Sequence, residues 1–316
     1  MPELPEVETV VRDLRPQLAG RRIESVQLTR DPAIRRRLVR YPNPTKFIRN
    51  LRGRTIRSVE RRGKYLVMPL DRGVAPRDGR SGPRPTRVAR DVPDERLRGS
   101  ANGAFETSGE RLVVHLGMTG HLRVWEPEET PVKHTHFRAL LDSGLELRYD
   151  DPRQFGRLLL GTQDELVAGR AFPARLGPEP IHSDLTEAEF DSIVTSRRRP
   201  IKSALLDQSF LAGVGNIYAD EACFRAGIRP SRWTRRLNAR ERRALYSAIQ
   251  EVLENGIAAR GSSIINYVDA FGVRGGNQEK LLVYGRSGEP CLKCGTPLQG
   301  TRLAGRGTVY CRKCQR

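Results

Sequence analysis

The sequence contains no apolar run long enough to cross a bilayer and no internal repeat. It begins with acidic and apolar residues rather than a basic, then hydrophobic leader, so we expect no secretory signal and a cytoplasmic location. Acidic side chains are scarce, with 37 Asp and Glu against 56 Lys and Arg and a formal charge of +19. This excess indicates a polyanionic partner, most simply nucleic acid; the alternative is a generally basic protein without one.

Cysteine is almost absent until the last 26 residues, which hold four of the five. Their spacing, Cys-x2-Cys-x16-Cys-x2-Cys, predicts tetrahedral Zn²⁺ rather than disulfides or free thiols. Four protein thiolates leave no open position for water, so the metal is expected to be structural. A segment this short cannot bury a core without it. With it we expect a β-hairpin whose tip carries Arg302 and Arg306. The four ligands are Cys291, Cys294, Cys311 and Cys314.

The first eight residues, MPELPEVE, suggest a chemical role for the N-terminus. Removal of Met1 would give Pro2 a free secondary amine, and an α-amino group has a reference pKa of about 7.7–8.0. Attack of that amine on a sugar C1′ would form a cationic iminium, which acts as an electron sink. Glu3 would then protonate the departing sugar oxygen. The other interpretation is an ordinary N-terminal helix with acidic residues at its positive end.

The N-terminal half predicts a β-sandwich with flanking helices over residues 1–165. Apolar residues recur at helical spacing from Val7 to Leu18, which predicts a helix over 5–19 ended by Gly20. Period-two patterns predict strands, with a hairpin turn at 142–144. The expected strands are 22–28, 55–60, 65–70, 111–116, 121–125, 137–141 and 146–149.

Four further segments complete the α+β multidomain organisation that we expect. Residues 73–108 hold five Gly, four Pro and seven Arg without apolar periodicity, which predicts a flexible insertion, either passive or a basic DNA tether. Residues 166–184 are expected to be an interdomain linker. Capping boxes at 186–189 and 238–241 begin helices of a helical domain over 185–285, and a zinc finger follows over 286–316.

Seven blocks along nearly the whole chain resemble the bacterial formamidopyrimidine-DNA glycosylases (Fpg, or MutM) of the Fpg/endonuclease VIII family. The insertion has no counterpart in the family pattern. Gln154 also departs from it, since Lys or Arg is usual there, so one phosphate contact is expected to be weaker. The blocks are residues 2–9, 62–65, 115–120, 151–156, 211–221 (a helix-two-turn-helix), 261–278 and the cysteine pairs.

The resemblance implies a bifunctional DNA glycosylase and abasic-site lyase. Its implied substrates are 8-oxoguanine opposite cytosine and formamidopyrimidines in double-stranded DNA. Pro2 would be the Schiff-base nucleophile and Glu3 the proton donor, while Glu6 orients the site. Lys64 would contact a phosphate and donate the proton for β-elimination. Arg306 would contact DNA and donate the proton for δ-elimination.

The resemblance also implies how the duplex is held. Met118, Arg153 and Phe155 would fill the gap left by the flipped nucleotide, which offsets an unstacking cost of a few kcal/mol. Residues 262–278 would close over the extruded base. In 211–221 two glycines would let the backbone approach a phosphate, and Asn216 would cap the following helix. The further implied DNA contacts are His115, His134, Lys202, Asn216, Tyr284 and Arg302.

Two alternatives stay open from the sequence. The endonuclease VIII branch prefers oxidised pyrimidines, but it typically has Gly at the position of Leu4, and Arg153 and Phe155 also favour Fpg. A non-catalytic DNA-binding protein would need neither the free amine of Pro2 nor the adjacent acid. We expect a monomer that acts on the bacterial nucleoid.

Overall fold

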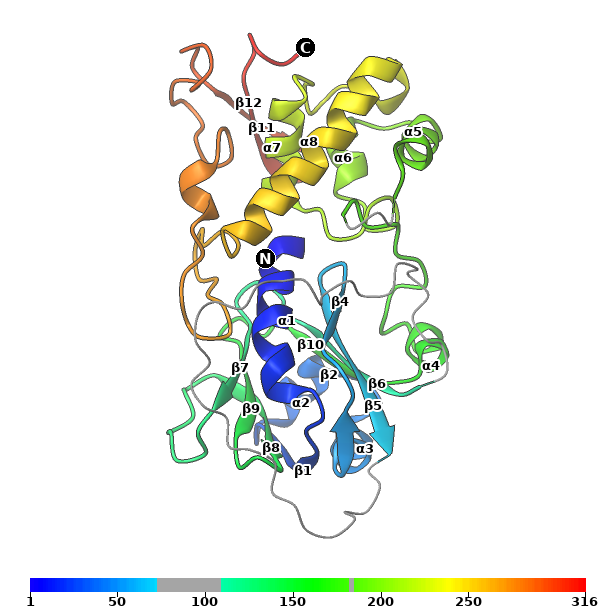
Figure 1. Ribbon diagram of the computed structural model, residues 1–316, viewed down its shortest axis with the longest axis vertical. Helices are drawn as coiled ribbons and strands as arrows, with labels where there is room; N and C mark the ends of the chain where they lie inside the picture. Colours follow the sequence, from blue (N-terminus) through cyan, green and yellow to red (C-terminus); the bar gives the residue numbers. More distant parts are fainter. Residues whose placement is uncertain (73–108, 182–184) are drawn as a thin grey trace.

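The computed structural model describes residues 1–72, 109–181 and 185–316. The expected insertion at 73–108 and part of the expected linker, 182–184, lie outside the described residues. The chain forms two lobes, one of sheets and one of helices with a C-terminal hairpin (Figure 1). Helix α1 (Leu4–Leu18) belongs to the sheet lobe, and its N-terminal end points into the junction with the helical lobe (Figure 1).

Helix α1 confirms the helix expected over 5–19. The residues that set its helical spacing, Val7 through Leu18, are buried in a core to which both sheets contribute. Leu4, one turn earlier, belongs instead to the core of the helical lobe. The first turn of α1 is therefore anchored in one lobe and the rest of the helix in the other.

The two sheets confirm the expected sandwich. One has the order β1-β8-β9-β7, and the other β2-β10-β6-β5-β3 with β4 paired to β5. The strands of the first sheet are β1 (Ile23–Leu28), β7 (His121–Trp125), β8 (Thr135–Leu141) and β9 (Glu146–Asp150). Those of the second are β2 (Val39–Tyr41), β3 (Arg54–Ile56), β4 (Glu60–Arg62), β5 (Tyr65–Arg72), β6 (Arg111–His115) and β10 (Arg157–Gly161).

Several strands and helices of the sheet lobe differ from those predicted or were not predicted. The strand expected over 55–60 is two strands, β3 and β4, because long β5 pairs with them in succession at opposite ends. Strand β10 was missed although it lies between β2 and β6, where burial removes the period-two signal. The other elements missed in the sheet lobe include β2 and three short helices, α2 (Pro32–Leu38), α3 (Pro44–Leu51) and α4 (Gln163–Ala168).

The helical lobe begins as expected, since Thr186 with Glu189 and Asn238 with Glu241 both form capping boxes. Helix α8 (Ala239–Ala258) packs on α7 (Asn216–Arg225), and both approach α1 or its first residues. The other helices are α5 (Glu187–Thr195), α6 (Ile201–Leu205) and the 3-10 turns η1 (Thr234–Arg236) and η2 (Asn277–Lys280). The C-terminal hairpin pairs β11 (Gln299–Leu303) with β12 (Arg306–Tyr310). Within the described ranges, no helix has the length and apolar content needed to cross a membrane.

Candidate active site and metal centre

The first residues of α1 and α7 meet at the junction between the lobes. The N–H of Leu4 donates to the carbonyl of Gly213 at 3.1 Å. The Glu3 carboxylate accepts from the backbone N–H groups of Ile217 at 3.1 Å and Tyr218 at 3.5 Å, in the first turn of α7. Unpaired N–H groups and the positive end of the helix favour a carboxylate there. Glu3 is thus oriented by a helix 214 residues further along the chain.

Two glycines make this approach possible. Gly213 has φ +96, in the region that favours glycine, and a Cβ there would lie 2.5 Å from the Leu4 side chain. Gly215 is the N-cap of α7, and a Cβ there would lie 2.3 to 2.6 Å from the atoms of the Glu3 carboxyl group. In this structure the glycines leave room for Leu4 and Glu3.

Glu6 is buried and joins three segments. Its carboxylate accepts from the N–H of Glu3 at 2.8 Å, the hydroxyl of Tyr218 at 2.7 Å and the N–H of Ser262 at 2.7 Å. Burial and the nearby Glu3 carboxyl raise the pKa of Glu6, while these hydrogen bonds oppose the rise. Glu6 therefore fixes the start of α1 against α7 and the loop after α8.

Three basic groups surround these acids. Burial lowers the pKa of the N-terminal amine, which in this chain belongs to Met1; Glu3 and Glu6 raise it, and Lys64 and Arg306 lower it further. Lys64 is only 6% exposed, and burial lowers the pKa of its ammonium too. Pro2 is buried beside them. A lowered amine pKa leaves more of the unprotonated, nucleophilic form at neutral pH.

The three residues expected to fill a gap in DNA lie on adjacent loops. Met118 and Phe155 are 39% and 46% exposed, unusual for large apolar side chains, and the Arg153 guanidinium lies 5.0 Å from the Phe155 ring centre. Both loops are tied to Asp151, which is fully buried. Asp151 accepts from the Thr119 hydroxyl at 2.6 Å and from the N–H groups of Arg153 and Gly156 at 3.2 and 2.8 Å.

His115 lies at the end of β6, and its ring is 5.0 Å from that of Tyr65. Burial, then the charges of Lys64 and Arg157, lower its pKa to about 4, so the ring is neutral at pH 7. Its Nδ1 accepts from the N–H of Gly117 at 3.2 Å. The proton therefore lies on Nε2, which is suited to donate to a phosphate oxygen.

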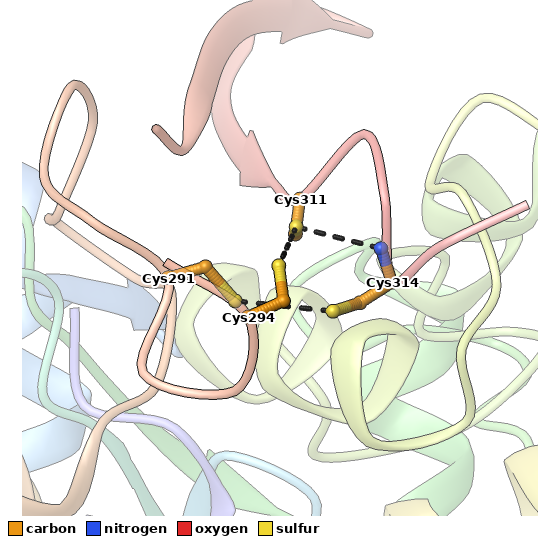
Figure 2. A group of neighbouring side chains, drawn as sticks. All are labelled: Cys291, Cys294, Cys311 and Cys314. Atoms are coloured by element: carbon orange, nitrogen blue, oxygen red, sulfur yellow. Dashed lines mark hydrogen bonds between the residues drawn. The ribbon is translucent and has the colours of Figure 1, made fainter. Parts of the chain in front are cut away.

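The four C-terminal cysteines converge as expected. Their sulfurs lie within 4.8 Å of one another; Cys291 and Cys314 are 4.0 Å apart, and Cys294 and Cys311 are 3.5 Å apart (Figure 2). Zn–S bonds of about 2.3 Å in a tetrahedron place sulfurs about 3.8 Å apart, so the donor set fits one Zn²⁺. Phe224 and Val283 pack against this finger, so the metal would fix it to the helical lobe.

Comparison with protein families accounts for most of the chain. Residues 1–158 match the formamidopyrimidine-DNA glycosylase N-terminal domain, 176–267 the formamidopyrimidine-DNA glycosylase H2TH domain, and 288–316 a zinc finger found in FPG and IleRS. This chain belongs to the formamidopyrimidine-DNA glycosylase family. The zinc finger match and the four sulfurs together identify one structural zinc site.

Relatives and solved structures extend the match over the full length. The chain is 43% identical over 319 residues to the formamidopyrimidine-DNA glycosylase of Heliobacterium modesticaldum, with 100% of both chains covered. It aligns with MutM (Fpg) of Thermus thermophilus at 37% identity and a TM-score of 0.77, over 99% and 98% of the two chains. A Lactococcus lactis Fpg mutant complexed with Fapy-dG-containing DNA gives 32% identity and a TM-score of 0.79, over 100% of both chains.

Lys202 and Asn216 make contacts that the sequence did not predict. Lys202 was expected to contact DNA, but its side chain is fully buried and its ammonium bonds to Asp220 at 2.7 Å and to the hairpin. Asn216 was expected to cap α7, but Gly215 is the N-cap and Glu3 accepts from the first-turn N–H groups. The side-chain amide of Asn216 donates to the Gly307 carbonyl at 3.1 Å instead.

Three further residues were expected to contact DNA, namely His134, Tyr284 and Arg302. The ring of His134 is 6.4 Å from that of His136, and Arg302 is exposed on β11. Tyr284 is half-buried, with its N–H donating to Glu221 at 2.9 Å, and burial raises its pKa.

Sequence reasoning missed several functional neighbours. Asp151 holds the two loops that carry Met118, Arg153 and Phe155 (the wedge loops). Tyr218 and Ser262 hold Glu6. All three lie in blocks that resemble the family, but the sequence does not show these roles. Arg37 of α2 donates to the Gln154 side chain at 3.3 Å, so a cation lies beside the position where the family usually has one.

Proposed function

We propose that this chain is a bifunctional DNA glycosylase and abasic-site lyase that removes oxidised purines from double-stranded DNA. Its substrates are 8-oxoguanine opposite cytosine and formamidopyrimidines. The observation that carries the proposal is the meeting of the N-terminal amine, Glu3, Glu6, Lys64 and Arg306 where α1 abuts α7. A binding protein has no need for a desolvated amine beside two carboxyl groups.

The proposed reaction begins after hydrolysis of the Met1–Pro2 peptide bond has freed the secondary amine of Pro2. Its nitrogen forms a bond to C1′ of the flipped nucleotide and loses its proton, and the damaged base leaves with the electrons of the glycosidic bond and takes up one proton. Glu3 protonates the sugar ring oxygen as the ring opens, which leaves an iminium at C1′.

Strand cutting follows from that iminium. Loss of a C2′ proton expels the 3′ phosphate, and a second elimination expels the 5′ phosphate. We assign Lys64 as the donor of a proton to the departing 3′ phosphate and Arg306 as the donor to the departing 5′ phosphate, because both cations are close enough to the amine to lower its pKa.

The DNA contacts form a second part of the proposal. Met118, Arg153 and Phe155 enter the gap left by the flipped nucleotide, and residues 262–278 close over the base. Phosphates and neighbouring groups are held by His115, His134, Asn216, Tyr284 and Arg302. The zinc supplies folding of the finger and takes no part in the chemistry.

The proposed organisation is a catalytic domain over 1–165, a linker over 166–184, a helical domain over 185–285 and a finger over 286–316. The protein acts as a monomer on the bacterial nucleoid.

The decisive experiment is borohydride trapping on a duplex with one 8-oxoguanine opposite cytosine, followed by mass mapping of the adduct. We expect an adduct at Pro2. The matched control carries an uncleaved extension before Met1, which removes the free amine of Pro2 and should abolish trapping while abasic-site binding persists. An adduct only with oxidised pyrimidines would assign the chain to the endonuclease VIII activity. Binding without any adduct would leave a non-catalytic role.

A further inference from the structure

A buried ion pair lies between the active site and the zinc finger. Lys202 of α6 and Asp220 of α7 are both fully buried, and their charged atoms are 2.7 Å apart. Removing two charges from water is costly, and attraction between them repays that cost only when further hydrogen bonds satisfy the remaining polar atoms. At this pair, those bonds reach into the C-terminal hairpin.

The pair holds three successive residues of β12. Lys202 Nζ donates to the Gly307 carbonyl at 2.7 Å and to the Thr308 hydroxyl at 2.8 Å. Asp220 accepts from the N–H of Val309 at 3.1 Å. The ion pair with Asp220 Oδ1 at 2.7 Å is the third polar contact of the ammonium. These bonds would break if β12 slid or tilted on the helices.

We propose that Lys202 and Asp220 are positioning residues that fix the strand beginning at Arg306, and so set where that guanidinium enters the active site. The proposal rests on the proposed function in one respect, the part that Arg306 plays in strand cutting. It replaces the DNA contact expected for Lys202 with an indirect role.

The zinc cannot position Arg306 alone. Its ligand Cys311 follows the last residue of β12, so at about 3.3 Å per residue it lies about 17 Å from Arg306 along the strand. A two-stranded hairpin is marginally stable by itself. Zinc therefore anchors the base of the hairpin, while the ion pair anchors the strand immediately after Arg306. The charge of Arg306 lowers the pKa of both the N-terminal amine and Lys64. A shift in the position of Arg306 would therefore alter the proposed proton transfers.

The first test is Asp220→Asn in the full-length, zinc-loaded protein, with the uncharged, similarly shaped pair Lys202→Met/Asp220→Asn as a second variant. The matched control is Asp191→Asn, which breaks the Arg242 ion pair in the same lobe without touching the hairpin. Zinc content, amide hydrogen exchange of residues 299–310, and the ratio of δ- to β-elimination products are measured on each.

We expect Asp220→Asn to keep one zinc per chain and to exchange faster at the Val309 amide. The δ-to-β product ratio should fall by about 10- to 100-fold, because a displacement near 1 Å can cost about 10²-fold in rate. The second variant should show the same two changes even if Asp220→Asn proves too unstable to assay. Restoring the carboxylate with Asp220→Glu should partly recover the ratio.

Unchanged exchange of 299–310 in both variants, with zinc retained, would overturn the positioning role. A failure of the proposed function looks different. In that case hairpin exchange rises as expected, but even Arg306→Ala leaves the product ratio unaltered.

Discussion

Substitution of Gly215 by alanine should disable catalysis while sparing the fold. The backbone at Gly215 has φ −132 and ψ −158, an extended conformation that alanine adopts without strain. The added methyl would lie 2.3 Å from the carboxyl carbon of Glu3 and 2.5 and 2.6 Å from its oxygens. These atoms are the far end of a flexible side chain, so the carboxyl group of Glu3 is expected to move while helix α7 stays in place. The group that moves is the proposed proton donor.

The expected magnitude follows from the geometry. Ordinary contact begins near 3.4 Å, so the carboxyl group must withdraw by about 1 Å. A misplacement of that size costs about 100-fold in rate, or about 2.7 kcal/mol in the barrier. The lost bonds to the N–H groups of Ile217 and Tyr218 are partly replaced by water, so we expect the free energy of unfolding to fall by no more than about 1–2 kcal/mol.

The assay is single-turnover excision of 8-oxoguanine by Gly215→Ala, together with binding to an abasic-site duplex and thermal unfolding. Gly109→Ala is the matched control, because a Cβ there meets nothing within 4 Å. Excision should slow while binding and folding persist. Excision at the rate of the unaltered protein would refute the reasoning that Glu3 must lie against α7.

Three further outcomes are expected. Burial opposes ionisation of Glu8, but its 2.8 Å bond to Arg61 outweighs burial and holds its pKa at about 2, below the ordinary 4.5. The resulting stabilisation, about 3 kcal/mol, is present above pH 4.5 and is lost as pH falls towards 2. Glu8→Gln should therefore weaken the dependence of the free energy of unfolding on pH between 4.5 and 2, and an unaltered acid midpoint would contradict this. Tyr149→Phe removes hydroxyl bonds to Leu116 and Asp151 at 3.0 and 3.1 Å, and should lower the free energy of unfolding by about 1–2 kcal/mol and weaken binding of gapped duplexes; equal affinity would show that the wedge loops hold without it. Zinc chelation or Cys294→Ala should abolish salt-dependent DNA binding while the total helix content measured by circular dichroism is kept, and retained binding would separate the finger from DNA recognition.

Much of the fold could be predicted because its signals are local. The apolar spacing of α1, the capping boxes that begin α5 and α8, and the cysteine spacing each specify structure within a few residues. Strand β10 and the short helix α2 could not be predicted in this way. The former is enclosed between β2 and β6, and the latter has only one buried residue, Leu38, to give it an apolar face.

The candidate site divides along the same line. Roles for Pro2, Glu3 and Glu6 could be proposed from the sequence because the three residues lie close together in a block that resembles the family. The sequence could not show that Glu3 accepts hydrogen bonds from a helix 214 residues away. Nor could it show that Lys202 forms a buried ion pair with Asp220. A lysine is expected at the surface, and only tertiary packing reveals the buried partner of Lys202.

The division of α1 between two cores explains why the site is assembled at this place. Leu4 packs in the helical lobe, whereas Val7 and the residues after it pack between the sheets. Glu3 and Glu6 accept hydrogen bonds from α7 or from the loop after α8, so the helical lobe orients these two carboxyl groups at the start of α1. The amine of Pro2 lies one residue before Glu3 and four residues before Glu6, so it cannot move far from either acid. A rotation of one lobe on the other would therefore pivot about the first turn of α1, where the nucleophile and its acid move least.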